Sequence, residues 1–149
     1  MIKGPDHSIY IASDHVGFQL KEQLIKHLSS INLMDIGTYG PELVDYVDYA
    51  IKTCNTMKYT DRAILICGSG VGMSIVANRF KHVRAVLGYN IRMVEVARQH
   101  NDVNVLCLGA RFLDTSSAID IVKAFLDTKF SEEDRHIRRI NKIDTHNYE

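Results

Sequence analysis

The chain has 149 residues, of which 46% are hydrophobic, enough for the core of a single domain spanning 1–149. Lysine and arginine number 18, as do aspartate and glutamate, so no net charge draws the chain to nucleic acid or to an anionic membrane. The three cysteines are far apart and form no Cys-x-x-Cys pair, which argues against a zinc ribbon and a disulfide framework. Neither the first residues nor any later segment has the apolar length of a signal peptide or a membrane span, so we expect a reducing cytoplasm.

Short β-rich runs alternate with longer segments of helical period. In chain order, strands are predicted at 8–13, 33–36, 62–67, 83–87 and 104–108, and helices at about 16–29, 44–59, 71–80, 91–100, 115–127 and 132–145. This alternation predicts an α/β fold, a three-layer α/β/α, Rossmann-like domain with a five-stranded, mainly parallel sheet. Such sheets bind ligands beyond the carboxyl ends of their strands, so the residues that follow each strand are the first candidates for function.

The first predicted strand ends in Ser13-Asp14-His15-Val16-Gly17. Asp14 is a suitable N-cap for the helix that follows, because its carboxylate can accept a backbone N–H. At the carboxyl end of a parallel strand, an acid beside an imidazole is equally suited to binding sugar hydroxyls and a phosphate. Both interpretations of Asp14 and His15 stay open.

The third predicted strand ends in Cys67-Gly68-Ser69-Gly70-Val71-Gly72. Glycines let backbone N–H groups converge on one point, and the following helix adds the positive end of its dipole, so the segment predicts an anion site. The same helix end favours the thiolate form of Cys67. A thiolate beside an anion hole is suited to removing a proton next to a carbonyl, since the hole holds the enediolate oxygen. A buried cysteine before an ordinary tight turn is the alternative.

Other glycine-loop and cysteine sites fit these residues poorly. Met73 stands where a dinucleotide fingerprint needs its third glycine and where a cysteine phosphatase needs an arginine. The Gly-Lys-Ser/Thr sequence of a nucleotide-triphosphate loop is absent. Cys67, His100 and Asn101 are similar in kind to the residues of a papain-like thiol hydrolase, but the local cysteine signature of that class is missing.

Two later segments carry imidazole and guanidinium groups. His100 ends a predicted helix, where it can cap the dipole or, beside a sugar, open a furanose ring by acid–base catalysis. Arg135 and Arg139 are four residues apart in the last helix and therefore share one face. That face is either solvated or, together with Arg111 after the fifth strand, a phosphate clamp. Isoleucines on the same helix, at about 132–145, predict that it packs on a neighbour such as a partner subunit.

Taken together, these segments resemble the type B ribose 5-phosphate isomerases and the related galactose 6-phosphate isomerase subunits. The similarity covers nearly the whole chain, and its paired Asp-His and Cys-Gly-Ser/Thr-Gly-x-Gly motifs are specific. The matching segments, in family order, are 13–18, 35–38, Asp45-Tyr46, 66–72, Ala77-Asn78, Arg84-Ala85, 98–102, 108–111 and 135–139.

The resemblance implies an isomerase that interconverts ribose 5-phosphate and ribulose 5-phosphate by ring opening and proton transfer through an enediolate, without a metal or an organic cofactor. It also implies a homodimer, or a dimer of dimers, that binds its small sugar phosphate between subunits. Cys67 would be the base, Ser69 a carrier of protons on the oxygens, and His100 the ring opener, with Asp14 nearby. The implied anion hole is Gly68, Ser69, Gly70, Val71 and Gly72, and the implied substrate and phosphate ligands are Asp14, His15, Tyr46, Asn101, Arg111, Arg135 and Arg139.

Two departures from the family pattern and two alternative functions accompany this prediction. Val47 stands where many members have proline, so the preceding loop is expected to differ. Some members carry serine at the position of Cys67 and use a glutamate elsewhere, whereas cysteine here favours a thiolate. A six-carbon sugar phosphate, such as allose or galactose 6-phosphate, could use the same residues, with 39–44 setting the pocket length. A non-catalytic phosphate- or nucleotide-binding module would explain the glycine loop and the arginines, but not Cys67 together with His100 and Asp14.

Overall fold

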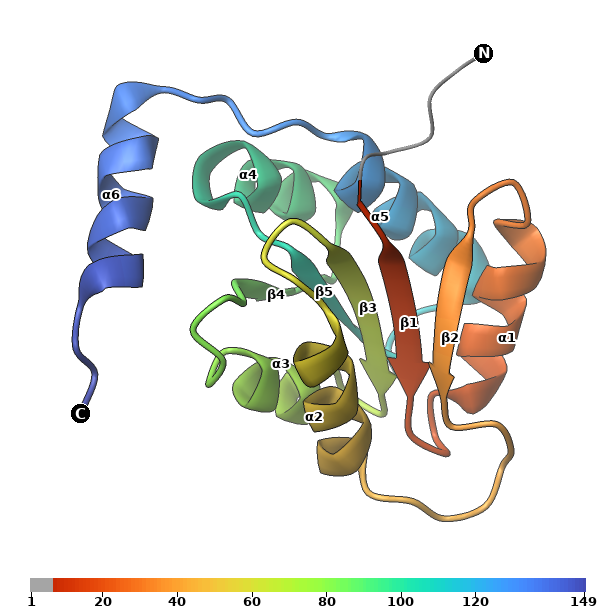
Figure 1. Ribbon diagram of the computed structural model, residues 1–149. Helices are drawn as coiled ribbons and strands as arrows, with labels where there is room; N and C mark the ends of the chain where they lie inside the picture. The colour runs from red at the N-terminus through yellow and green to blue at the C-terminus, as the bar shows by residue number, and fades with distance from the viewer. Residues whose placement is uncertain (1–6) are drawn as a thin grey trace.

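The computed structural model describes residues 7–149; the first six residues, on which part of the signal-peptide argument rests, lie outside this range. Its five strands form one parallel sheet in the order β2-β1-β3-β5-β4 (Figure 1). The strands are β1 (Ile9–Ser13), β2 (Leu33–Gly37), β3 (Arg62–Cys67), β4 (Ala85–Leu87) and β5 (Val105–Gly109). The helices are α1 (Phe18–His27), α2 (Tyr46–Thr56), α3 (Val71–Ala77), α4 (Ile91–Asn101), α5 (Thr115–Asp127) and α6 (Asp134–Thr145).

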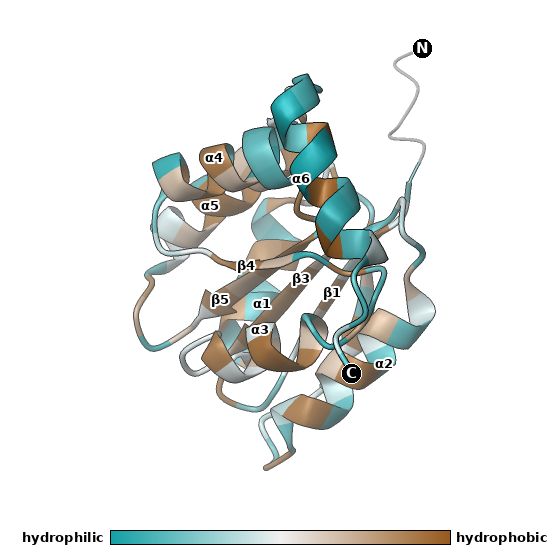
Figure 2. Ribbon diagram, turned by 90° about the vertical axis from the view of Figure 1, so that its left-hand side faces the viewer, coloured by the Kyte–Doolittle hydropathy of each residue, from teal (hydrophilic) through white to brown (hydrophobic). Residues whose placement is uncertain are grey.

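Helices cover both faces of this sheet. α1, α4 and α5 pack on one face through side chains such as Leu24, Val94 and Phe125, and α2 and α3 cover the other through Ala50 and Met73. In Figure 2 the strands form a hydrophobic layer between the helices. Strands buried on both faces are typical of parallel sheets, and the predicted three-layer α/β/α fold is confirmed.

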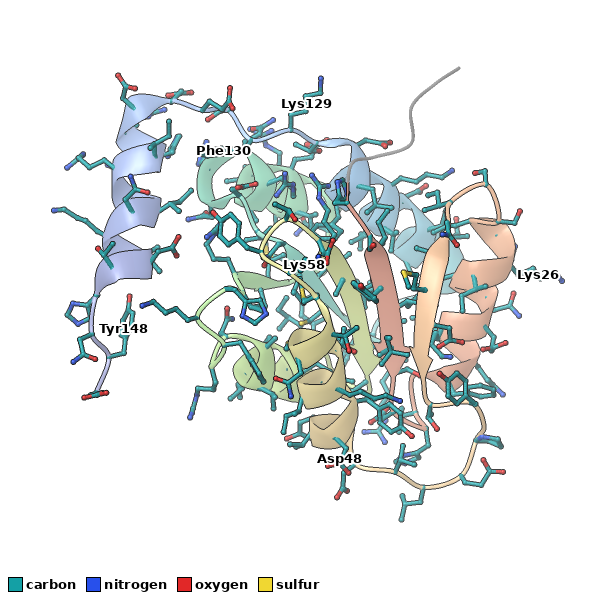
Figure 3. All side chains as sticks on the ribbon, in the orientation of Figure 1. Lys26, Asp48, Lys58, Lys129, Phe130 and Tyr148 are labelled. Atoms are coloured by element: carbon teal, nitrogen blue, oxygen red, sulfur yellow. The ribbon has the colours of Figure 1, made fainter. Side chains whose placement is uncertain are left out.

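Charged side chains point outward from several helices and from the segment after α5. Lys26 on α1, Asp48 on α2 and Lys129 after α5 are exposed, and their side chains extend away from the sheet (Figure 3). Among residues 7–149, no helix combines the length and the apolar character that crossing a bilayer requires.

The strand order places a topological switch point between β1 and β3. β1 leads into α1 on one face of the sheet, whereas β3 leads into α3 on the other. The two loops therefore diverge and leave a crevice at the carboxyl edge, which is where sheets of this kind bind ligands. The N–H of Asp14 donates to the carbonyl of Ile66 (3.1 Å) and ties the two strand ends together.

Several predicted boundaries differ from the structure, as in the helix predicted at 44–59, which spans only 46–56. At two others, side chains replace backbone partners. The helix predicted at 71–80 ends at Ala77, since the Asn78 side chain accepts the Ala85 N–H (2.8 Å) and donates to the Ala85 carbonyl (3.1 Å). The strand predicted at 83–87 spans only 85–87, because the N–H of Arg84 donates to the side chain of Asn104 (2.8 Å).

Candidate active site

An open cavity of about 470 Å³ lies in the crevice at the carboxyl edge of the sheet. Four segments contribute: the loop after β1, the start of α2, the loop from β3 into α3, and the turn after β5. The lining residues are Asp14, His15, Val16, Tyr46, Cys67, Gly68, Ser69, Val71, Gly72, Ile75 and Arg111. Among them, only Val16 and Ile75 had no role assigned from the sequence.

Cys67 lies at the base of the glycine loop, with only 4% of its surface exposed. Its Sγ accepts the N–H of Gly70 at 3.1 Å, and the N–H of Val71 donates to Ser69 Oγ at 3.2 Å. Gly70 has a φ of +77°, in the left-handed region that favours glycine, and it is not among the cavity lining. Two N–H groups that the sequence assigned to the anion hole therefore donate within the loop. The Gly70 N–H bonds the Cys67 thiol, and the Val71 N–H bonds the Ser69 hydroxyl.

Arg111 brings a permanent positive charge to the same loop. Its backbone N–H donates to the Gly68 carbonyl (3.0 Å), and the N–H of Ala110 donates to the Cys67 carbonyl (2.8 Å). The guanidinium lies against Gly68, where an added Cβ would stand 3.1 Å from Nη1. A cation at this position attracts an anionic ligand.

Asp14 and His15 form the opposite wall. Asp14 Oδ1 accepts the N–H of Gly17 (2.9 Å), and Gly17 is the residue that precedes α1, so the predicted capping role holds in part. His15 Nδ1 lies 3.1 Å from the carbonyl oxygen and 3.3 Å from the amide nitrogen of Val44. When Nδ1 accepts that N–H, Nε2 carries the proton and is available as a donor to a phosphate.

Tyr46 closes one side of the cavity by packing on Gly72. A Cβ at Gly72 would stand 2.5 Å from two carbons of the Tyr46 ring, so glycine is what lets the ring approach the helix start. The ring is 37% exposed, which leaves it accessible to a ligand. Tyr46, which the resemblance implies as a substrate ligand, therefore lines this cavity.

The structure keeps His100 and Asn101 of the same chain away from this cavity. α4 begins beyond the carboxyl end of β4 and runs back along the sheet, so its last turn lies at the edge where the strands begin. The Asn101 carbonyl accepts from Arg84 Nε (2.9 Å), just before β4. A five-residue strand separates the two edges by about 16 Å. His100 is therefore not near Asp14 within one chain.

An ion cluster of Arg84, Arg98, Asp102 and Asp144 holds the end of α4; we call it the start-edge cluster. Arg98 donates to Asp102 Oδ1 (2.8 Å), and Arg84 reaches Asp102 Oδ2 (3.4 Å) and Asp144 Oδ2 (3.1 Å). Both arginines are buried, with 8% and 3% exposure, and they also donate to backbone carbonyls. Arg98, which precedes His100, and Arg84, which bonds the carbonyls of Asn101 and Asp102, thus hold the segment that carries His100 and Asn101.

α6 stands beside α4 and carries the predicted arginine face (Figure 1). The ring of His136 stacks on His100 with 4.2 Å between centroids, and its Nε2 has no hydrogen-bond partner among the described residues. Burial, together with neighbouring His100 and Arg135, holds the pKa of His136 below its ordinary value. Arg135 pairs with Glu133 (2.9 Å) at the surface. Like His100, Arg135 and Arg139 do not line the cavity of their own chain.

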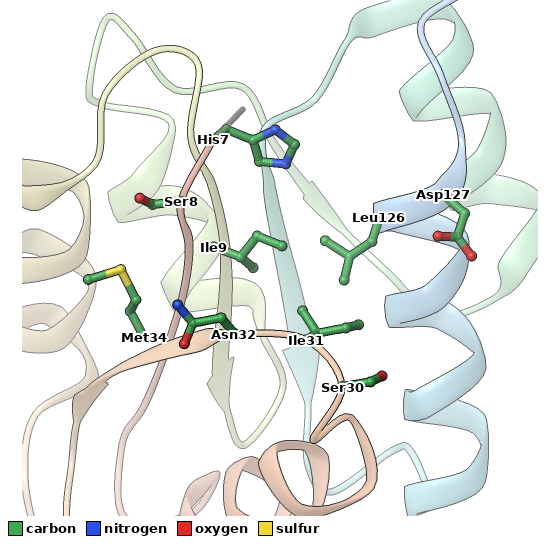
Figure 4. A pocket seen from close by; sticks show the side chains of 9 residues that line it. All are labelled: His7, Ser8, Ile9, Ser30, Ile31, Asn32, Met34, Leu126 and Asp127. Atoms are coloured by element: carbon green, nitrogen blue, oxygen red, sulfur yellow. The ribbon is translucent and has the colours of Figure 1, made fainter. Parts of the chain in front are cut away.

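A second cavity, of about 580 Å³, lies at the edge where β1 and β2 begin (Figure 4). Its lining is His7, Ser8, Ile9, Ser30, Ile31, Asn32, Met34, Leu126 and Asp127. Within the described part of the chain, no lysine or arginine contributes to this lining. A phosphate would find no fixed positive charge there, so the smaller cavity with Cys67 and Arg111 is the better candidate.

Two residues that support the site were not identified from the sequence. Lys21 is fully buried, and its Nζ lies 2.7 Å from both carboxylate oxygens of Asp35, which also accepts the N–H of Gly37. This pair fixes the end of β2, from which the chain leads to Tyr46. Tyr89 donates its hydroxyl hydrogen to the carbonyl of Ser69 (2.7 Å). Neither contact has a sequence signal, because the partners are 14 and 20 residues apart.

The fold and cavity define an α/β protein whose thiol and anion-binding groups meet at the switch point of a parallel sheet. No group of three or more metal-ligating side chains was found among residues 7–149.

A family model described as Ribose/Galactose Isomerase matches residues 9–143. The chain belongs to this family, which confirms the resemblance seen in its motifs.

Individual relatives agree with the family. Ribose-5-phosphate isomerase B of Escherichia coli is 40% identical over 139 residues, covering 91% of this chain and 93% of that protein. A putative sugar phosphate isomerase of Rickettsia bellii is 44% identical over 142 residues, covering 93% and 98%. The structure of ribose-5-phosphate isomerase B from Mycoplasma genitalium with bound ribulose-5-phosphate has a TM-score of 0.88 and 41% identity, covering 95% of this chain and 96% of that one.

Proposed function

We propose that this chain is an aldose–ketose isomerase that interconverts ribose 5-phosphate and ribulose 5-phosphate. The observation that carries the proposal is the Cys67 thiol in a cavity that also presents Arg111 and Asp14. Relatives named for this activity cover more than nine-tenths of the chain, and one of them was solved with ribulose-5-phosphate bound.

The chemistry assigned to Cys67 is a proton transfer. The thiolate removes the proton from C2 of the open-chain aldose, the electron pair forms a double bond between C1 and C2, and the aldehyde oxygen becomes the enediolate oxyanion. Returning the proton to C1, while a proton moves from O2 to O1, gives the ketose. Ser69 would assist the transfer between the oxygens, and those N–H groups of the 68–72 loop that are not used inside it would hold the negative charge of the enediolate.

The phosphate is proposed to bind His15, Arg111, Arg135 and Arg139. The sugar would contact Tyr46 and Asn101, and His100 would open the ring. Four of these residues, His100, Asn101, Arg135 and Arg139, lie outside the cavity of their own chain. A homodimer, alone or paired into a tetramer, in which each cavity faces the start edge of a second copy would complete the site. Isologous association of this kind gives two equal sites for each dimer.

α6 supports this assembly. It is strongly amphipathic in sequence, and Ile137 and Ile143 are 37% and 44% exposed beside the buried Ile140. An apolar stripe that its own chain leaves partly uncovered is suited to a subunit contact. We therefore propose one domain, with α6 packing on the partner subunit. A reducing compartment such as the cytoplasm fits the three cysteines, all of which are free.

The direct experiment is isomerisation of ribose 5-phosphate in heavy water, with Cys67→Ala as the test variant. Wild-type enzyme should incorporate deuterium at C2 of the aldose or C1 of the ketose. Cys67→Ala should lose about 10⁴-fold in turnover, the upper range for a general base, and still bind sugar phosphate. Cys54→Ala is the matched control, because burial raises the pKa of Cys54 to about 11 and keeps that thiol protonated.

Near-native turnover of Cys67→Ala would remove the thiol from the mechanism. Binding without any exchange by wild-type protein would instead favour a non-catalytic phosphate-binding module. The family description also names galactose, so the same assay on allose or galactose 6-phosphate decides between five- and six-carbon substrates. We expect ribose 5-phosphate to have the higher kcat/KM.

A further inference from the structure

The peptide between Ser69 and Gly70 is hydrogen-bonded on both sides. Its carbonyl oxygen accepts the Tyr89 hydroxyl at 2.7 Å, and its N–H donates to Cys67 Sγ at 3.1 Å. A trans peptide is planar, and its C=O and N–H point in opposite directions. Fixing the carbonyl toward Tyr89 therefore fixes the N–H toward the thiol.

The two bonds also strengthen each other. A donor on the carbonyl oxygen polarises the amide and makes its N–H a better donor, by about 10–30% for each bond in a chain. The acceptor here is a sulfur that carries negative charge when it acts as a base, and bonds to charged groups are the stronger ones. The hydroxyl of Tyr89 thus acts on Cys67 through one peptide without touching the cavity.

The fold holds Tyr89 at this position. The residue follows β4 directly after Gly88, and Asn90 caps α4 by accepting the N–H of Met93 (2.8 Å). The Tyr89 ring packs edge-on against Phe112, with 6.1 Å between centroids and 85° between planes. On the other side of the loop, a Cβ at Gly109 would stand 2.6 Å from the Ser69 carbonyl oxygen, so β5 restricts the peptide as well.

We propose that Tyr89 is a positioning residue for Cys67, whose hydroxyl orients the Ser69–Gly70 peptide and thereby stabilises the thiolate. The inference rests on the proposed function for the role of that thiolate in turnover. Its main readout, the reactivity of the thiol itself, does not require isomerase activity.

Other ionisable groups around Cys67 stay the same when the hydroxyl is removed. Asp14, His15, Tyr46 and Arg111 share the cavity, and the thiols of Cys54 and Cys107 lie in the same core. Burial raises the pKa of both core thiols, so they remain protonated. Any difference between wild type and Tyr89→Phe in the titration of Cys67 is therefore due to the missing hydroxyl.

The experiment compares wild type with Tyr89→Phe, which keeps the ring and its packing on Phe112. Alkylation of Cys67 by iodoacetamide is followed against pH and measured by mass spectrometry on the peptide that contains it. The pH midpoint should rise by about 0.3 unit or more, equivalent to a ~2-fold loss of thiolate below the midpoint. On ribose 5-phosphate, kcat should fall ~2-fold or more with KM unchanged.

Two variants serve as controls. Tyr148→Phe removes a hydroxyl in the tail that follows α6 (Figure 3) and should leave the midpoint unchanged. Phe112→Leu weakens the packing of the Tyr89 ring but keeps its hydroxyl, and should shift the midpoint less than Tyr89→Phe. Equal midpoints in wild type and Tyr89→Phe, or an equal shift in Phe112→Leu, would overturn the proposal. A normal shift in a protein without isomerase activity would instead contradict the proposed function alone.

Discussion

The two edges of the sheet hold their functional groups in different ways. At the carboxyl edge, Cys67 lies in an open cavity and is held by a glycine loop whose contacts are mostly backbone hydrogen bonds. At the start edge, the segment with His100 and Asn101 is held by the start-edge cluster, in which buried arginines pair with partly exposed aspartates. The carboxyl edge presents its thiol in a cavity, and His100 and Asn101 do not line that cavity.

This difference indicates how the fold divides its tasks. The strand order itself brings backbone groups to the crevice at the switch point. Glycines then let these groups come close to a ligand. The end of α4 has no such support, because helices run against the strands and finish at the other edge. The start-edge cluster gives the last turn of α4 a defined position there, and we propose that a second copy uses His100 from this position.

Among changes at the two edges, Arg84→Met in the start-edge cluster is expected to have the largest effect on the free energy of unfolding. The change leaves the Asp144 carboxylate without its arginine, leaves Asp102 paired with Arg98 alone, and removes donors to the carbonyls of Asn101 and Asp102. Because the arginine is buried but the carboxylates are partly exposed, the loss should lower the free energy of unfolding by about 2 kcal/mol, measured by urea denaturation. Turnover should fall as well, while alkylation of Cys67 stays normal.

Arg92→Met is the matched control, since Arg92 is 76% exposed and pairs with Glu95 at 3.7 Å. Its effect on stability should stay within about 0.5 kcal/mol. If Arg84→Met and Arg92→Met had equal effects, the start-edge cluster would not be what positions α4.

A smaller effect on the stability of the start edge is expected from pH, through His136. The histidines of an unfolded chain titrate near pH 6.5, whereas burial beside His100 and Arg135 lowers the pKa of His136 in the folded chain. Between the two values the unfolded state binds a proton that the folded state does not. The stability that neutral His136 contributes is therefore present above about pH 6.5 and is lost as the pH falls below it.

The test is the difference between the melting temperatures at about pH 7.5 and about pH 5.5. This difference should be smaller in His136→Asn than in wild type, because asparagine does not titrate. An unchanged difference would mean that the stack of His136 on His100 does not respond to pH.

The sequence predicts the elements well where local signals dominate. The strand at 62–67 and the helix at 115–127 match the structure to the residue, since the first is a continuous apolar run and the second has a strong helical period. Where a distant side chain intervenes, the prediction fails by a few residues, as Asn78 shows by ending α3 through its bonds to Ala85.

The same contrast holds for the candidate site. Asp14, Cys67 and the glycines were predictable, because the carboxyl-end rule gathers the residues that follow parallel strands. The position of His100 could not be predicted in this way. His100 lies at the end of α4, at the edge where the strands begin, and it stacks there on His136 of α6. Tyr89 and Lys21 were missed because their roles depend on contacts between segments distant in sequence, which no local motif records.

We propose that each active site combines the carboxyl edge of one copy with the start edge of another. Co-refolding equal amounts of Cys67→Ala and His100→Ala, each inactive alone, tests it directly. Half of the dimers formed would be mixed, and each of these would hold one intact site, so about a quarter of wild-type activity should return. If the mixture stayed as inactive as the separate variants, no site would combine residues of two copies, and Cys67 and His100 would act within one chain.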